Sequence, residues 1–143
     1  MKKILVLHGP NLNLLGTREP DLYGSESMED LNARLKEFGK KHGLDVVCLQ
    51  SNVEGELVNY LQEHGFDGSG IVFNPGGYTH TSVSIRDAVA SIETPVLEVH
   101  ISHPEGREEF RHKSLIRPVC LGTISGLGRE GYFAALRYFM DEK

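Results

Sequence analysis

The sequence predicts an α/β protein in which five short strands form a parallel sheet with helices on both faces. Two observations carry this prediction. Short, continuous apolar runs alternate along the chain with longer segments whose apolar residues recur at helical spacing. The apolar runs lack polar alternation, which is typical of strands that are buried on both faces. Regular alternation of the two kinds of segment indicates successive strand–helix–strand units.

The five apolar runs are interpreted as strands because glycine, proline or polar residues bound each of them. The first run ends at Gly9-Pro10, and Pro95 precedes the fourth. The predicted strands cover residues 4–8, 46–49, 71–73, 96–100 and 119–124.

Four helices are predicted between and after these strands, with a short helix near residues 108–113. Ser27 with Asp30 resembles a capping box at the start of the first helix, and Gly43 and Gly65 are suited to end the first and second. The residues that mark the four helices are Met28, Leu31, Leu35, Phe38 and His42; Val53, Leu57, Tyr60 and Leu61; Ile85, Ala88, Val89 and Ile92; and Tyr132, Phe133, Leu136, Phe139 and Met140.

Right-handed crossovers between these elements lead to a flavodoxin-like doubly wound sheet as the economical fold. The order of the strands does not follow from the pattern. The chain has 143 residues, without an internal repeat or linker, so residues 1–143 are expected to form a single domain.

Charge and composition argue against a nucleic-acid partner, a membrane span and a secreted protein. The formal net charge of −5 argues against a nucleic-acid partner, and no apolar run approaches the ~20 residues of a membrane span. The apolar N-terminal run is too short for a signal peptide and is better interpreted as a strand. Cys48 and Cys120 lie in apolar, strand-like runs, so we expect buried, reduced thiols and a cytoplasmic location.

Polar residues that follow the strands are the candidates for function, because open α/β sheets bind ligands at the carboxyl ends of their strands. About 18 residues separate the first strand from its helix, where about 2–6 are usual, so a lid or binding loop is expected there. A second loop covers residues 74–82, and a third follows His100 and contains Arg107 and Arg111.

The residue types in these loops suit binding of a carboxylate and transfer of protons. Arg111 could hold a carboxylate by a charge-assisted pair. Backbone N–H groups of Ile101 and Ser102, at the start of a short helix, could add donors. His100 could donate a proton to a leaving hydroxyl group.

The first loop offers a candidate base. Tyr23 could accept a proton only as a phenolate, which requires its pKa to fall by about 2–3 units from its usual value near ~10. Arg18 is the obvious cation for that task. Asn11 and Asn74 could polarise a carbonyl or orient a water molecule, and so stabilise an enolate.

Each feature also has an ordinary structural interpretation. Residues 9–11 and 74–77 are typical of tight turns, the second before a helix cap at Thr81 or Ser82. Tyr23 and His100 could serve packing alone, and residues 107–111 could form a solvated face. His80, His100, His103 and His112 suggest a metal, but no His-x-x-x-His or His–Cys pattern supports one. The glycine-rich loops match no nucleotide-binding fingerprint.

Six motifs, in order, resemble those of the type II 3-dehydroquinate dehydratases (type II dehydroquinases). They are a Gly-Pro-Asn-Leu turn, an Arg-Glu-Pro-x-x-Tyr-Gly lid, an Asn-x-Gly-x-Tyr-Thr-His-Thr-Ser loop, a Glu-Val-His-x-Ser strand end, an Arg-Glu-Glu-Phe-Arg segment and a Gly-x-Ile-x-Gly-x-Gly-x-x-Gly-Tyr segment. In this chain they are residues 9–12, 18–24, 74–82, 98–102, 107–111 and 122–132. The resemblance runs from about residue 4 to residue 140.

The resemblance implies dehydration of 3-dehydroquinate to 3-dehydroshikimate through an enolate, without a cofactor or metal, in the shikimate pathway of aromatic amino-acid biosynthesis. By position, Tyr23 would be the base, Arg18 would activate it, and both would lie on a mobile lid. His100 would be the general acid, held in place by Glu98. Asn11 would position a water molecule that stabilises the enolate.

The resemblance also implies a set of binding residues and an assembly. The residues that would hold the hydroxyl and carboxylate groups are Asn74, His80, Ile101, Ser102 and Arg111. Asp87 would reach into the site of a neighbouring subunit, because the family assembles trimers into a dodecamer. Two departures from the pattern are His8, where the family usually has Asn, and the segment 102–106, where it usually has Ser-Asn-x-His-Ala.

Two other functions compete with the dehydratase. The first is a catalytically silent module that binds a small carboxylic acid and retains Arg111. The second is a flavin- or phosphate-binding flavodoxin-like protein, for which the sequence offers little. Tyr23 and Arg18 favour the dehydratase, because a binding module does not need an activated phenol.

Overall fold

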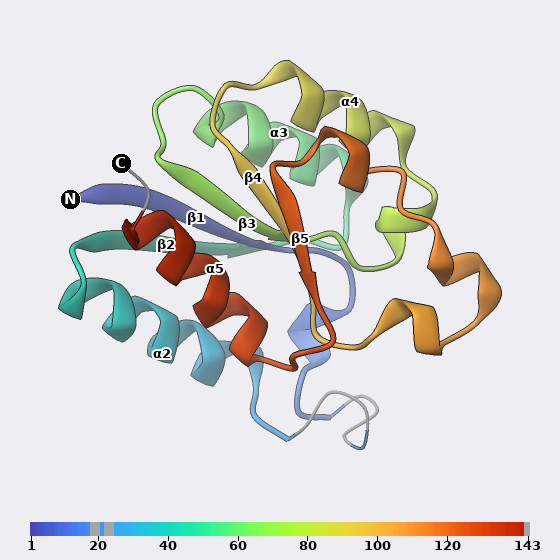
Figure 1. Ribbon diagram of the computed structural model, residues 1–143, viewed down its shortest axis with the longest axis horizontal. Coiled ribbons are helices and arrows are strands. Elements are labelled where there is room, and N and C mark those ends of the chain that lie inside the picture. The colour runs from blue at the N-terminus through green and yellow to red at the C-terminus, as the bar shows by residue number, and fades with distance from the viewer. Residues whose placement is uncertain (18–20, 22–24, 142–143) are drawn as a thin grey trace.

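The computed structural model describes residues 1–17, 21 and 25–141, and its centre is a five-stranded parallel sheet (Figure 1). The strands lie in the order β2-β1-β3-β4-β5, which is the flavodoxin-like order, so the predicted fold class is confirmed. The bounds of the strands are β1 (Lys2–His8), β2 (Leu44–Gln50), β3 (Gly70–Asn74), β4 (Val96–His100) and β5 (Gly122–Ser125).

Helices cover both faces of this sheet. α2 (Met28–Lys41) and α5 (Glu130–Asp141) pack on one face, and α3 (Glu54–His64) and α4 (Val83–Ser91) pack on the other (Figure 1). Short 3₁₀ helices occupy the connections: η1 (Leu12–Leu14), η2 (Gly76–His80), η3 (Pro104–Gly106), η4 (Glu109–His112) and η5 (Arg117–Val119).

The place of β1 inside the sheet, between β2 and β3, explains why residues 4–7 are all apolar. Ile4 and Val6 pack into the core beneath α2 and α5, whereas Leu5 and Leu7 pack into the core beneath α3 and α4. Successive side chains of a strand point to opposite faces, so a strand in the middle of a covered sheet needs apolar residues on both. Each of these side chains is at most 3% exposed, and burying one contributes roughly 1.5–3 kcal/mol to stability.

Serine side chains cap the two helices for which the sequence predicts a cap. The Ser27 hydroxyl accepts a hydrogen bond from the Asp30 N–H at 3.1 Å, at the start of α2. Ser82, rather than Thr81, caps α4, and its Oγ accepts from the Ile85 N–H at 2.9 Å. The Ser82 hydroxyl also donates to Glu54 Oε2 at 2.5 Å, so this cap joins α4 to the first turn of α3.

The predicted start of the fifth strand was wrong. Residues 117–119 form η5, and β5 begins only at Gly122. Pro118 has no N–H to donate to a sheet and lies in the first turn of η5, where its fixed φ is tolerated. Val119 and Cys120 are apolar because they pack against the core beneath α3 and α4, not because they belong to a strand.

Both cysteines are free, but they are half-buried rather than fully buried. Cys48 lies within β2, and Cys120 lies before β5. Desolvation raises the pKa of the Cys48 thiol to about 11 and that of Cys120 to about 12, so both stay protonated at neutral pH. Within the described part of the chain, no helix is long and apolar enough to cross a bilayer.

We predict that Ser82→Ala lowers the free energy of unfolding by about 1–2 kcal/mol, because α4 loses its cap and Glu54 loses a hydrogen-bond donor. Urea unfolding measures this change. Ser84→Ala is the matched control, because Ser84 lies exposed in the first turn of the same helix. Equal stability of the two variants would contradict the capping role.

Candidate active site

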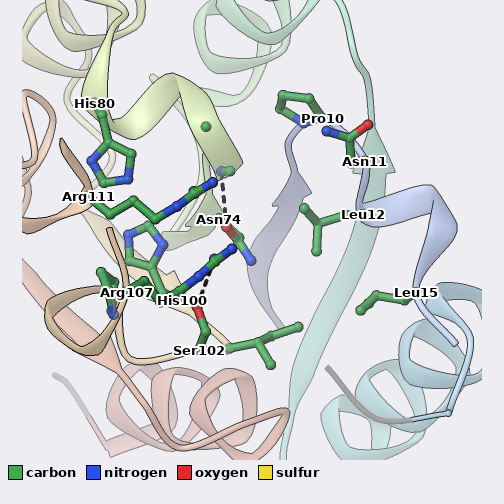
Figure 2. Close-up of a pocket in the computed structure, with 14 residues that line it drawn as sticks. Pro10, Asn11, Leu12, Leu15, Asn74, His80, His100, Ser102, Arg107 and Arg111 are labelled. Carbon is green, nitrogen blue, oxygen red and sulfur yellow. Dashed lines mark hydrogen bonds between the residues drawn. The ribbon is translucent and has the colours of Figure 1, made fainter. Parts of the chain in front are cut away.

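A pocket opens at the carboxyl ends of β1, β3 and β4. It lies beside the boundary between β1 and β3, where the order of the strands reverses and where doubly wound sheets bind their ligands. Its lining residues come from three connections: Pro10, Asn11, Leu12 and Leu15 after β1; Asn74, Gly76, Gly77 and His80 at and after β3; and His100, Ile101, Ser102, Pro104, Arg107 and Arg111 at and after β4. Figure 2 shows the arginine and histidine side chains on one side of the pocket and Asn11, Leu12 and Leu15 on the other.

Two turns join at the floor of this pocket. The Gly9 N–H donates to the Asn74 carbonyl oxygen at 2.7 Å, which extends the pairing of β1 with β3 by one step. A Cβ at Gly9 would lie 2.6 Å from the carbonyl carbon and oxygen of Pro75, so only glycine allows the two turns to approach this closely.

Asn11 adopts a left-handed backbone conformation with φ 70°, which asparagine tolerates better than most residues. Its N–H donates to Asn52 Oδ1 at 2.9 Å, and Gln50 Nε2 donates to the Gly9 carbonyl oxygen at 3.2 Å. Contacts from β2 and the residues that follow it therefore hold the turn and position Asn11 at the rim of the pocket.

A buried carboxylate holds the pocket histidine. Glu98 and His100 are two residues apart on β4, so their side chains lie on the same face of the sheet. His100 Nε2 lies 2.7 Å from Glu98 Oε2, and the Ser114 hydroxyl donates to Glu98 Oε1 at 3.0 Å. Glu98 is 0% exposed and Arg117 Nη2 lies 4.0 Å from it, so the carboxylate has partners on both oxygens and a cation nearby.

This arrangement determines what His100 can do. A carboxylate only accepts hydrogen bonds, so Nε2 carries a hydrogen and the other ring nitrogen, Nδ1, is the one left for a ligand. Nδ1 is therefore the ring atom placed to exchange a proton with a ligand, while the contact with Glu98 holds the ring in one orientation.

Two arginines give the pocket its positive charge. Arg107 Nη1 donates to the Ser102 hydroxyl at 3.4 Å (Figure 2), and Arg111 Nε donates to Glu108 Oε1 at 2.9 Å. The side chains of Arg107 and Arg111 are 16% and 20% exposed, so solvent screens their charges only partly. Two partly buried guanidinium groups on one wall suit a carboxylate ligand.

His80 and Asn74 add polar groups with a fixed orientation. His80 Nδ1 donates to the Lys113 carbonyl oxygen at 2.6 Å, which leaves Nε2 as its second polar atom. The Asn74 side chain accepts from the Gly76 N–H at 3.1 Å (Figure 2) and donates to the Tyr132 hydroxyl oxygen at 2.9 Å. Both side chains are thus held by contacts within the chain rather than by a ligand.

The structure brings most of the predicted site residues together. Those that line the pocket are Asn11, Asn74, His80, His100, Ile101, Ser102 and Arg111. Glu98 lies behind His100 rather than in the wall. Asp87 lies on α4, pairs with Arg86 at 2.9 Å and does not belong to the described lining of this pocket. Arg18 and Tyr23 lie outside the described residues.

One expectation about the wall was wrong. Ile101 and Ser102 do not begin a helix, because the next helix, η3, starts only at Pro104 and is a single 3₁₀ turn. The short helix expected near residues 108–113 is also a 3₁₀ helix, η4. The backbone N–H groups of Ile101 and Ser102 therefore do not lie at a helix N-terminus, which would have helped them to bind an anion.

Two contributors to the site were not assigned a role from the sequence. Arg107 was noted beside Arg111 in the third candidate loop, and a solvated face was left open as the ordinary interpretation of residues 107–111. No motif or spacing in the sequence indicated Ser114, because its contact with Glu98 forms only when the segment after η4 packs against β4.

A family model and two relatives of known name indicate the same family. The model of the family described as dehydroquinase class II matches residues 2–140. The 3-dehydroquinate dehydratase of Bacillus licheniformis is 52% identical over 141 residues, which cover 99% of this chain and 97% of that protein. The 3-dehydroquinate dehydratase of Ruegeria pomeroyi is 54% identical over 136 residues, which cover 95% and 91%.

Solved structures show the same likeness in three dimensions. The type II dehydroquinase from Butyrivibrio crossotus superposes with a TM-score of 0.94 at 48% identity, and the match covers 96% of this chain and 97% of that one. The type II dehydroquinase from Propionibacterium acnes has a TM-score of 0.96 at 42% identity, with 99% and 98% covered.

We predict that Gly9→Ala lowers the free energy of unfolding by about 1–3 kcal/mol, because the new methyl group must push the Pro75 backbone away. Gly55→Ala is the matched control. Its Cβ would meet no atom within 4 Å, and alanine should stabilise α3 by roughly 0.5–1 kcal/mol. Thermal and urea unfolding measure both variants, and a Gly9→Ala protein as stable as the wild type would refute the close contact.

Proposed function

The chain belongs to the dehydroquinase class II family, and from that premise we propose how its pocket removes water from 3-dehydroquinate. The activity is that of a 3-dehydroquinate dehydratase, a hydro-lyase of the shikimate pathway for aromatic amino-acid biosynthesis. The product is 3-dehydroshikimate. The observation that carries the mechanism is the buried Glu98–His100 pair, which faces a pocket with two arginines on its wall.

The reaction proceeds in two proton transfers through an enolate. A base removes a proton from the carbon next to the ketone, and the electrons of that C–H bond form the enolate. When the enolate collapses, its electrons form the carbon–carbon double bond and break the bond to the leaving hydroxyl group. His100 protonates this oxygen from Nδ1, and water leaves. Glu98 holds the ring in place through its contact with Nε2.

The base in this proposal is Tyr23, with Arg18 as the cation that favours its phenolate form. Both assignments rest on the Arg-Glu-Pro-x-x-Tyr-Gly motif, and both residues lie outside the described part of the chain. Asn11, at the rim of the pocket, orients a water molecule toward the enolate oxygen. The proposed reaction consists of proton transfers and shifts of electron pairs within the substrate. The proposal therefore includes no cofactor and no metal.

Recognition of the substrate is assigned to the remaining wall. Arg111 binds the carboxylate, because it is a partly buried cation beside the 101–102 segment, and Arg107 shares this charge. Asn74, His80, Ile101 and Ser102 bind hydroxyl and carboxylate oxygens. A carboxylate that is far from the reacting bonds is held equally in the ground state and the transition state.

We also propose a homo-oligomer, a dodecamer built from four trimers, in which each chain acts as one catalytic domain. The side chain of Asp87 is 61% exposed and lies on α4, which leaves its carboxylate able to contact a second subunit. We further propose that the enzyme works in the cytoplasm, because Cys48 and Cys120 are free thiols, as a reducing compartment maintains them.

The direct test is to mix the purified protein with 3-dehydroquinate in the presence of a chelator and follow the ultraviolet absorbance of the conjugated enone. We expect the absorbance to grow in proportion to enzyme concentration. A protein that binds 3-dehydroquinate without forming the enone would instead be the silent carboxylic-acid-binding module.

Arg111→Ala and Tyr23→Phe should affect different kinetic constants. We predict that Arg111→Ala raises KM by roughly 10- to 100-fold with little change in kcat, because a charge-assisted hydrogen bond contributes about 1.5–3 kcal/mol to binding. Tyr23→Phe should lower kcat by at least about 100-fold with substrate binding retained.

Steady-state kinetics and calorimetric binding separate these effects. Arg137→Ala is the control for Arg111, because Arg137 is an exposed arginine on α5. Unchanged KM in the Arg111 variant would remove Arg111 from the binding site, and a fully active Tyr23→Phe protein would remove Tyr23 as the base.

We predict that Asp87→Ala weakens the assembly or lowers activity, because it removes a carboxylate that reaches a neighbouring site. Light scattering and the dehydration assay measure both properties. Asp67→Ala is the control, since Asp67 is a 72% exposed carboxylate that pairs with Lys3 at 3.7 Å. An Asp87→Ala protein that is fully assembled and fully active would exclude this role.

A further inference from the structure

A row of buried polar side chains runs from Asn74 in the pocket to α2, and its members behind Asn74 have no role in the mechanism above. Asn74 Nδ2 lies 2.9 Å from the Tyr132 hydroxyl oxygen, which lies 3.5 Å from His8 Nδ1, and His8 Nε2 lies 2.8 Å from Asn32 Oδ1. His8 and Tyr132 are 0% exposed, and Asn74 is 5% exposed. The row thus connects the last residues of β1 and β3 through α5 to α2.

The direction of every hydrogen bond in this row follows from its two ends, the Gly76 N–H and the Asn32 oxygen. The Gly76 N–H can only donate, so the atom of Asn74 that faces it at 3.1 Å is the oxygen Oδ1. The nitrogen Nδ2 therefore faces Tyr132 and donates to its oxygen. At the other end, Asn32 presents its oxygen Oδ1 to His8 Nε2, so Nε2 carries the hydrogen and donates it. The neutral His8 ring then accepts at Nδ1, which lies 3.5 Å from the Tyr132 oxygen, so the hydroxyl hydrogen is directed there.

Burial keeps this pattern of hydrogens in place. Desolvation lowers the pKa of His8 to about 4, against a smaller opposing effect of the Asn32 hydrogen bond, so the ring is neutral at physiological pH. Burial also raises the pKa of Tyr132 above its ordinary value, so the phenol keeps its hydrogen. One hydrogen is then available for each contact, and no two donors face each other.

Asn74 is the member of the row that lines the pocket. A side-chain amide has two N–H groups and two oxygen lone pairs. One N–H is taken by Tyr132 and one lone pair by Gly76, so one N–H and one lone pair are left for a ligand. Without Tyr132, the buried Nδ2 loses its partner, and the amide gains freedom to rotate or to turn toward the pocket.

We propose that Tyr132 and His8 are positioning residues that hold the Asn74 amide in one orientation, and so fix the N–H and the carbonyl lone pair with which it binds a substrate hydroxyl group. The inference rests on the proposed dehydratase function and deepens it, because it names two residues behind the wall that determine recognition.

Neighbouring contacts connect this row to the floor of the pocket. The carbonyl oxygen of His8 accepts from the Ser51 N–H at 3.1 Å, and the Gly9 N–H donates to the Asn74 carbonyl oxygen. The His8 and Tyr132 rings also pack together, with centroids 5.5 Å apart. The backbone around Asn74 is therefore held independently, so removing the Tyr132 hydroxyl should release mainly its side-chain amide.

The test is a double-mutant cycle of Tyr132→Phe and Asn74→Ala in the assembled enzyme. We expect Tyr132→Phe alone to raise KM for 3-dehydroquinate by about tenfold, with a smaller change in kcat, because the binding amide loses its fixed orientation. In the Asn74→Ala background, the same substitution should change KM by less than about twofold, since Tyr132 acts only through the amide. Melting temperature is recorded for all four proteins.

Two further sets of variants separate positioning from general stability. Phe139→Leu is the matched control, because Phe139 is a buried core residue of the same helix; it should lower the melting temperature and leave KM unchanged. His8→Leu should raise KM as Tyr132→Phe does. His8→Gln should keep KM close to that of the wild type, because a glutamine amide can accept from Tyr132 and donate to Asn32.

The outcomes are distinct. A tenfold rise in KM that persists in the Asn74→Ala background, or a fall in melting temperature with no change in KM, would overturn the proposal. If the wild-type enzyme showed no turnover, the dehydratase function itself would fail. The same cycle would then be measured as the Kd for 3-dehydroquinate by calorimetry, and additive effects on Kd would reject the positioning role.

Discussion

The pocket depends on the parallel pairing of β1 with β3 and on the single backbone hydrogen bond that continues it, from the Gly9 N–H to the Asn74 carbonyl oxygen at 2.7 Å. This contact brings together two turns that are far apart in sequence. It is sterically possible only because Gly9 has no side chain, since a Cβ would overlap the Pro75 carbonyl group. Asn11 and Asn74 take their places in the wall as a consequence, and the wall formed after β4 completes the site beside them.

The charge of the pocket differs in sign from the net charge of the chain. The chain has a formal net charge of −5, yet among the described residues Arg107, Arg111, His80 and His100 line its pocket. Glu98 is buried, and a buried polar group without partners is costly, so its contacts with His100 and Ser114 and the proximity of Arg117 offset the cost of its burial. The same buried side chain orients the proposed general acid.

Local signals made most of the fold predictable, and contacts between distant residues account for what was not. The strand at residues 96–100 and the Ser27 cap follow from apolar runs and cap chemistry within a few residues. The start of β5 was wrong because Val119 and Cys120 are apolar for a tertiary reason. In the site, loop residues after strands were identifiable by position and motif. The contacts of Tyr132 with Asn74 and His8 join residues 58 and 124 positions apart, which no local pattern indicates.

The central claim is that the Glu98 charge, acting on His100 in the pocket at the ends of β3 and β4, drives the loss of water. The most direct measurement is kcat for Glu98→Gln beside calorimetric binding of 3-dehydroquinate. Glutamine has nearly the shape of glutamate but no charge, so the account predicts that kcat falls by about 100-fold or more while Kd changes by only a few-fold. An unchanged kcat with intact binding would contradict it.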